Sequence, residues 1–139
     1  MSEAEQLSRW WRSVEEAVSR GDGIVHDLDG WPAEVSTLAE VAVAEVRFDL
    51  VGAQKLLDGL ESLSSPWNHV AGLLSLRLEF RGSRGDRASL EQLLEDSKQL
   101  IAELDRSEGT TCARTRHLMA TVNLQLNRPG DALDQMAVA

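Results

Sequence analysis

Four arginines gather in one stretch of an otherwise acidic chain: Arg77, Arg81, Arg84 and Arg87. Arg77 and Arg81 are four residues apart, so they share one face if this stretch is helical. Guanidinium groups hold carboxylates and phosphates through paired hydrogen bonds, which suits the capture of an acidic partner. The alternative is internal pairing with nearby glutamates, for which the sequence offers Glu79, Glu91 and Glu95.

Residues that hold metals or cofactors do not form a recognisable set. The three histidines are His26, His69 and His117, and none has a ligand-type partner at the spacing of a zinc motif. The glycines of the sequence GSRGDR, residues 82–87, lack the spacing of a phosphate-binding loop. We therefore expect no metal site and no cofactor. Cys112 is the one cysteine of the chain, so an internal disulfide is excluded and a reducing compartment is favoured.

The segment Ile24-Val25-His26-Asp27-Leu28-Asp29-Gly30 carries two aspartates after a short apolar run. It resembles the nucleophile motif of haloacid-dehalogenase-type phosphatases. The resemblance implies Asp27 as the nucleophile and Asp29 as the acid/base beside Mg²⁺. That family needs a parallel sheet, whereas residues 33–139 show helical periodicity. A polar loop between helices is the competing interpretation, and the phosphatase is kept as a third hypothesis.

Length and charge restrict the class of protein. The chain has 139 residues and a net charge of −9, which fits one domain that nucleic-acid phosphates and acidic membranes would repel. The N-terminal sequence lacks the order of a signal peptide, and no apolar run is long enough to span a membrane. We expect a cytoplasmic protein that binds neither nucleic acid nor membrane. Twelve Arg against two Lys indicate a GC-rich bacterial genome.

Hydrophobic residues recur at intervals of three and four along most of the chain, which predicts an all-α protein. Clusters of Gly, Ser and Pro separate the periodic stretches. The predicted helices number seven and cover residues 3–20, 33–48, 49–63, 66–81, 88–104, 110–126 and 131–138. The second helix is apolar over a wide face, so we expect it in the middle of the core. Short loops predict that most neighbouring helices form antiparallel hairpins.

Two sets of small or medium apolar residues recur at the same two intervals: Val41, Ala53 and Leu60, and Ala120, Ala132 and Ala139. The second set lies in MATVNLQLNRPGDALDQMAVA, which resembles the tetratricopeptide repeat. Small residues at these positions let paired helices approach closely. A middle unit would begin near Pro66 with Gly72 at the small position, although the spacing between units is irregular and no unit carries the full family pattern.

The resemblance implies stacked antiparallel helical hairpins in a right-handed superhelix over residues 33–139, with residues 1–32 as an N-terminal capping helix and loop. The first helix of each hairpin would line a concave face that binds peptides or partner helices. The residues expected to bind a partner, from this face and the arginine cluster, are His69, Leu73, Arg77, Arg81, Arg114, His117, Thr121 and Gln125.

We therefore expect a non-catalytic interaction or scaffold module that binds an acidic protein or peptide near Arg77, Arg114 and His117. The alternative is a regulatory or sensor domain that binds a small ligand between hairpins. At the C-terminal end we expect either self-association through terminal helices or a frayed last helix.

The pair Trp10-Trp11 permits two interpretations. Adjacent residues are about 100° apart on a helix, so the two side chains cannot both point at one core centre. An exposed Trp would contact a partner, whereas a helix lying between core and solvent would account for the pair without one.

Overall fold

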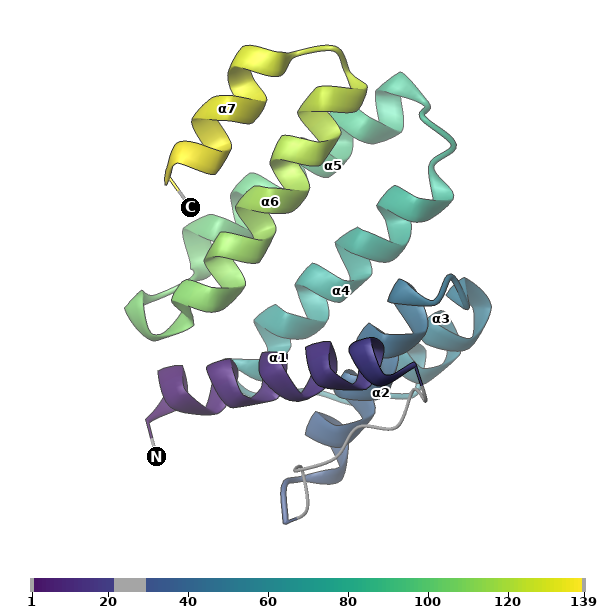
Figure 1. Ribbon diagram of the computed structural model, residues 1–139, viewed down its shortest axis with the longest axis vertical. Helices are drawn as coiled ribbons and strands as arrows, with labels where there is room; N and C mark the ends of the chain where they lie inside the picture. Colours follow the sequence, from purple (N-terminus) through teal and green to yellow (C-terminus); the bar gives the residue numbers. More distant parts are fainter. Residues whose placement is uncertain (1, 22–29, 139) are drawn as a thin grey trace.

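The computed structural model describes residues 2–21 and 30–138. Within these ranges the chain forms seven α-helices and one short 3-10 helix, and it contains no strand (Figure 1). The helices are α1 (Glu3–Arg20), α2 (Ala33–Val46), α3 (Leu50–Asp58), α4 (Trp67–Gly82), α5 (Arg87–Glu103), η1 (Arg106–Glu108), α6 (Gly109–Gln125) and α7 (Pro129–Val138). The prediction of an all-α domain with seven helices is confirmed. Asp27 and Asp29 of the phosphatase hypothesis, together with His26, lie outside the described residues.

Local sequence sets most helix ends. Ser2 caps α1, since its side chain accepts a hydrogen bond from the Glu5 amide at 3.2 Å. Gly21 ends α1 with φ of 77°, a left-handed conformation that glycine adopts without a Cβ clash. The predicted third helix was too long, because α3 stops at Asp58. Gly59 is a weak helix former, and proline at position 66 disfavours helical backbone in the residue before it.

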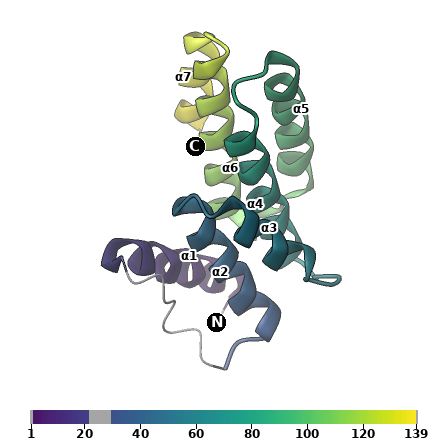
Figure 2. The same ribbon diagram turned by 90° about the vertical axis from the view of Figure 1, so that its right-hand side faces the viewer.

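Most contacts join helices that are neighbours in sequence. Each α-helix from α1 to α6 packs against the next α-helix in sequence, and α4 in addition touches α2 and α6. Figure 2 shows the result in space, with α1 and α2 at one end of the molecule and α7 at the other. As predicted, α2 lies among neighbours, since it contacts α1, α3 and α4. The short helix η1 was not predicted. A capping box of Asp105 and Glu108 starts it.

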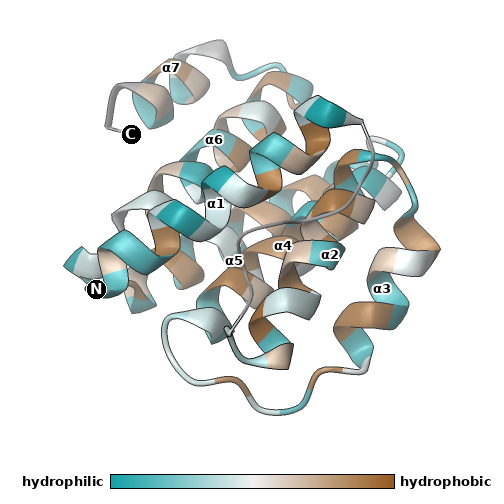
Figure 3. Cartoon of the chain, turned by 60° about the horizontal axis from the view of Figure 1, so that its bottom comes forward, coloured by the Kyte–Doolittle hydropathy of each residue, from teal (hydrophilic) through white to brown (hydrophobic). Residues whose placement is uncertain are grey.

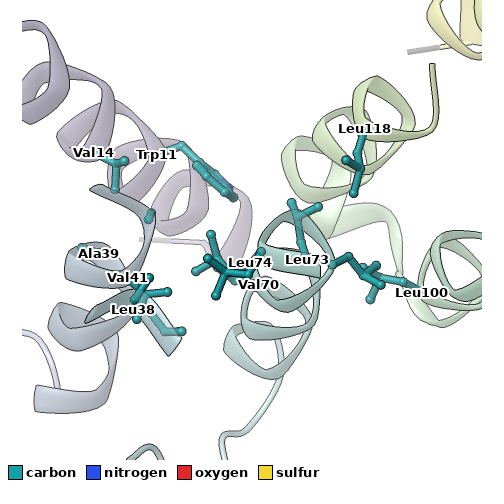
Figure 4. Close-up of a cluster of buried hydrophobic side chains, with 14 of the residues drawn as sticks. Trp11, Val14, Leu38, Ala39, Val41, Val70, Leu73, Leu74, Leu100 and Leu118 are labelled. Atoms are coloured by element: carbon teal, nitrogen blue, oxygen red, sulfur yellow. The ribbon is translucent and has the colours of Figure 1, made fainter. Parts of the chain in front are cut away.

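The hydrophobic core runs through the middle of this arrangement. Figure 4 shows side chains from five helices meeting around α4, among them Trp11, Leu38, Leu74, Leu100 and Leu118. Leu38 and Leu74 have no exposed surface. Figure 3 shows hydrophilic residues on the outer side of α1 and hydrophobic ones on much of α4 behind it. No helix in the described ranges is long and apolar enough to span a membrane.

Helix α1 lies crosswise to α4 and α6 (Figure 1) and contacts α2, α6 and η1. Helix α1 therefore contacts both α2, which follows it in sequence, and α6, which lies much later in the chain. Trp10 and Trp11 are both buried, at 0% and 2% exposure, so the interpretation with one exposed Trp was wrong. Adjacent positions on a helix can both be buried because α1 has neighbours on two sides. The Trp10 indole donates to the Val35 carbonyl of α2 at 3.0 Å, and Trp11 lies under Arg114 of α6.

Candidate functional site

A groove of about 670 Å³ opens between α4 and α6 beside the end of α2. Five residues predicted to bind a partner line it, namely Arg77, Arg81, Arg114, His117 and Thr121. The remaining walls are formed by Glu45, Phe80, Thr110, Ala113 and Leu118. We call this feature the arginine groove. The structure thus brings together most of the side chains that the sequence pattern placed on one face.

Helical spacing and one tertiary contact explain this convergence. Arg77 and Arg81 are one turn apart on α4, and the groove residues of α6 follow at intervals of three and four. Each helix therefore turns one row of polar side chains to the same side. Because α4 packs against α6, the two rows face each other across the groove.

The innermost charge of the arginine groove is Glu45, which is 1% exposed. Its carboxylate accepts a hydrogen bond from Arg77 Nε at 2.5 Å and forms an ion pair with Arg81, whose Nε lies 3.1 Å away. A buried carboxylate is tolerated only when it is paired and hydrogen-bonded, and two guanidinium groups meet that need here. Arg77 and Arg81 remain about one quarter exposed, at 24% and 26%. Their other N–H groups are therefore within reach of a ligand in the groove.

Sequence reasoning missed Glu45 because it lies 32 residues from Arg77, on another helix. The internal pairing considered in the sequence analysis is confirmed for one arginine of the cluster, Arg87, which pairs with Glu91. Glu91 pairs with Arg87 and Arg128, and Glu95 pairs with Lys98. One signal was present in the sequence. Glu45 interrupts the wide apolar face of α2, and an acidic residue in such a face requires a basic partner from a neighbouring helix.

Arg114 connects the arginine groove to α1. Its guanidinium pairs with the Glu15 carboxylate and lies 4.2 Å from the centre of the Trp11 ring. Cations are attracted to the face of an aromatic ring, so both contacts hold Arg114 toward α1. Three guanidinium groups, those of Arg77, Arg81 and Arg114, thus meet two carboxylates, those of Glu45 and Glu15. The groove keeps a surplus of one positive charge in a strongly acidic chain.

The other three predicted residues lie outside the groove. His69 is directed at Glu108, with Nδ1 2.5 Å from its carboxylate. Leu73 has no exposed surface and points toward α6 within the core, so it has no surface to offer a partner (Figure 4). Gln125 is exposed near the end of α6 but does not line the groove. Residues spaced four apart on α4 therefore differ in role. His69 pairs with Glu108 and Leu73 packs in the core. Arg77 and Arg81 line the groove.

Side chains that could bind a metal ion do not cluster in the part of the chain that the structure describes. No group of three or more His, Cys, Asp or Glu side chains there could hold an ion. Cys112 is a free thiol of intermediate exposure. The arrangement offers guanidinium donors and one imidazole around an open space, which is the chemistry of binding an acidic group.

Comparison with protein-family models, with curated proteins and with solved structures finds no match for this chain.

Proposed function

We propose that this protein is a non-catalytic interaction module that binds an acidic segment of a partner protein in the arginine groove. The observation that carries this proposal is the convergence of Arg77, Arg81, Arg114 and His117 on one open groove of about 670 Å³. The partly exposed guanidinium groups of the three arginines can donate hydrogen bonds to carboxylates of a peptide or helix. In a chain of net charge −9, such a surface favours acidic ligands locally while the rest of the molecule repels them.

A tetratricopeptide-like arrangement is part of the proposal. In this arrangement α2, α4 and α6 are the first helices of three successive hairpins, and the contacts of α4 with both α2 and α6 support that order. Ala53, Ala120 and Ala132 are buried at 0%, 2% and 2%, as small residues between close helices should be. Because α1 touches α6 as well as α2, it would lie across the inner side of the stack, beside the groove.

Peptide selection tests the proposed function directly. Peptides from a random displayed library are selected on the immobilised protein, and the best binder is compared with its Gln-for-Glu and Asn-for-Asp counterpart. We expect Asp and Glu to be enriched among the binders, and binding to weaken with salt because exposed charges are screened. A library that yields no acidic enrichment would overturn the proposal.

A matched pair of variants tests whether the acidic peptide binds in the arginine groove. Thr121→Glu adds a carboxylate to the groove without breaking an ion pair, since the Thr121 hydroxyl bonds to the His117 carbonyl of its own helix. One turn later, Gln125→Glu adds the same charge outside the groove. We expect Thr121→Glu to weaken the acidic peptide by roughly fivefold to tenfold, which corresponds to about 1 kcal/mol between like charges in water. Equal effects of the two variants would place the binding elsewhere.

A further inference from the structure

A second cavity is lined by residues of α1, α2, α4 and α6. Its volume is about 380 Å³. The walls include the apolar residues Trp11, Val14, Val18, Ala42 and Val46, while Arg77 and Arg114 supply cationic groups. We call it the Trp11 cleft. It shares only those two arginines with the arginine groove.

Two residues that line this cleft each have a buried hydrogen-bond donor without an acceptor. Among the described residues, neither the indole N–H of Trp11 nor the Nε of Arg114 has a hydrogen-bond partner, although both atoms are buried. The two groups are close together, since the Arg114 guanidinium lies over the Trp11 ring. Buried donors are nearly always satisfied in folded proteins. An acceptor at this place is therefore missing from the protein's own atoms.

The lining restricts the chemistry of that acceptor. A guanidinium and an indole N–H both donate, so the group between them accepts, and a negative charge on it would be favoured by Arg114 and Arg77. The valine and alanine side chains require the rest of the ligand to be apolar. The volume of the cleft is many times the ~30 Å³ that one water molecule occupies in the liquid. A cationic or wholly polar ligand fits this lining poorly.

We propose that the Trp11 cleft binds a small monocarboxylate with an apolar body. The carboxylate accepts hydrogen bonds from Trp11 Nε1 and from Arg114, and the hydrocarbon part lies against Val14, Val18 and Ala42. This site goes beyond the proposed binding of an acidic protein segment: it shares Arg77 and Arg114 with the groove, but its ligand, its apolar walls and its test are different.

Glu15 is the group that opposes such a ligand. It lines the same cleft, and its carboxylate is paired with Arg114. Its side chain is 58% exposed, so it can turn into solvent when another carboxylate takes its place. Glu15 therefore competes with the ligand for Arg114. Removing its charge strengthens binding, which is an effect that simple damage to the fold would not produce.

The test uses the whole protein labelled with ¹⁵N, with hexanoate as the probe and hexylamine of the same chain length as the comparison. The indole N–H signals of the four Trp residues are followed by NMR. We expect hexanoate to shift the Trp11 signal downfield, as a new acceptor does, and hexylamine to leave it in place. An unmoved Trp11 signal at saturating hexanoate, or the same shift with hexylamine, overturns the proposal.

Variants then locate the ligand. Glu15→Gln should tighten hexanoate binding severalfold, whereas Glu16→Gln, an exposed neighbour on α1 that does not line the cleft, should not change it. Trp11→Phe keeps an aromatic ring but lacks the N–H, and it should weaken binding at least about tenfold as measured on the backbone amides of α2.

Val18→Phe fills the cleft from a half-buried position and provides a second route if Trp11→Phe fails to fold. Folding of each variant is checked by its thermal transition. Unchanged affinity in a folded Val18→Phe variant, or no gain in Glu15→Gln, would refute the site even if acidic peptides still bind the groove.

Discussion

Each end of α4 pairs with a buried glutamate, but the two ends use different side chains to do so. Near its start, His69 faces the carboxylate of Glu108, and near its end, Arg77 and Arg81 face the carboxylate of Glu45. Both glutamates are 1% exposed. Glu108 also accepts from the backbone amide of Asp105 at 3.4 Å, as part of the capping box that starts η1. Side-chain interactions of Glu45, by contrast, are all with the two arginines among the described contacts.

The comparison shows what decides the role of a buried charge. At the His69 end, the Glu108 carboxylate helps to form the capping box that starts η1, and it does not line the groove. At the Arg77 end, the Glu45 carboxylate orders two guanidinium groups beside an open groove, where part of each remains exposed. Equal burial therefore does not imply equal function, because the partners determine whether donors are left over for a ligand.

The largest effect should come from removing both partners of Glu45. The double variant Arg77→Met and Arg81→Met leaves a buried carboxylate without a cation, and we expect a loss of about 3–5 kcal/mol in the free energy of unfolding. Adding Glu45→Gln should restore part of the loss, since the buried charge disappears. Urea unfolding measures all three proteins. If Glu45→Gln brings no recovery, the arginines stabilise the fold by packing rather than by charge.

A smaller effect is expected at the other end of α4. His69→Ala removes one of the hydrogen-bonding partners of Glu108 and should cost about 1–3 kcal/mol, because the Asp105 amide still satisfies part of the carboxylate. His117→Ala is the matched control, since His117 is exposed in the groove and its loss should change stability by less than about 0.5 kcal/mol. A loss for His69→Ala as large as that of the double arginine variant would remove the distinction between the two ends.

The smallest effect concerns acid sensitivity next to His69. Hydrogen bonds from the side chain and the backbone amide of Ser107 hold the pKa of Asp105 below its ordinary value, and His69 lowers it further by a smaller amount. Since the folded pKa is lower than the unfolded one, the ionised Asp105 stabilises the fold at neutral pH. That contribution disappears as the pH falls below about 4, through the folded value.

Ser107→Ala should raise the pKa of Asp105 toward its ordinary value, as followed by the carboxyl ¹³C signal during an acid titration. His69→Ala should raise it less. Asp86 serves as the control, because hydrogen bonds from Ser89 lower its pKa in the same way without a histidine nearby in the chain. A larger rise from His69→Ala than from Ser107→Ala would mean that charge, rather than hydrogen bonding, dominates at this end.

Much of the groove was predictable because it depends on helical spacing. Arg77 and Arg81 had to share a face of α4, and the resemblance to the tetratricopeptide repeat implied that Arg114, His117 and Thr121 lie on one face of α6. Leu73 belongs to the same row as Arg77 but is buried. Helical spacing predicts the face of the helix on which a residue lies, but it does not predict how deeply a neighbouring helix buries that residue. The partner Glu45 could not be assigned for the same reason, since nothing in the local sequence joins α2 to α4.

The number of α-helices and most of their ends follow from the amino-acid sequence alone, because 3.6-residue periodicity, caps and helix-breaking residues act over a few positions. The tertiary structure alone decided that α1 crosses to α6, burying both Trp10 and Trp11, and that Glu45 anchors two arginines. These outcomes depend on contacts between residues far apart in the chain, where only the competition for buried surface and for charge partners selects one arrangement.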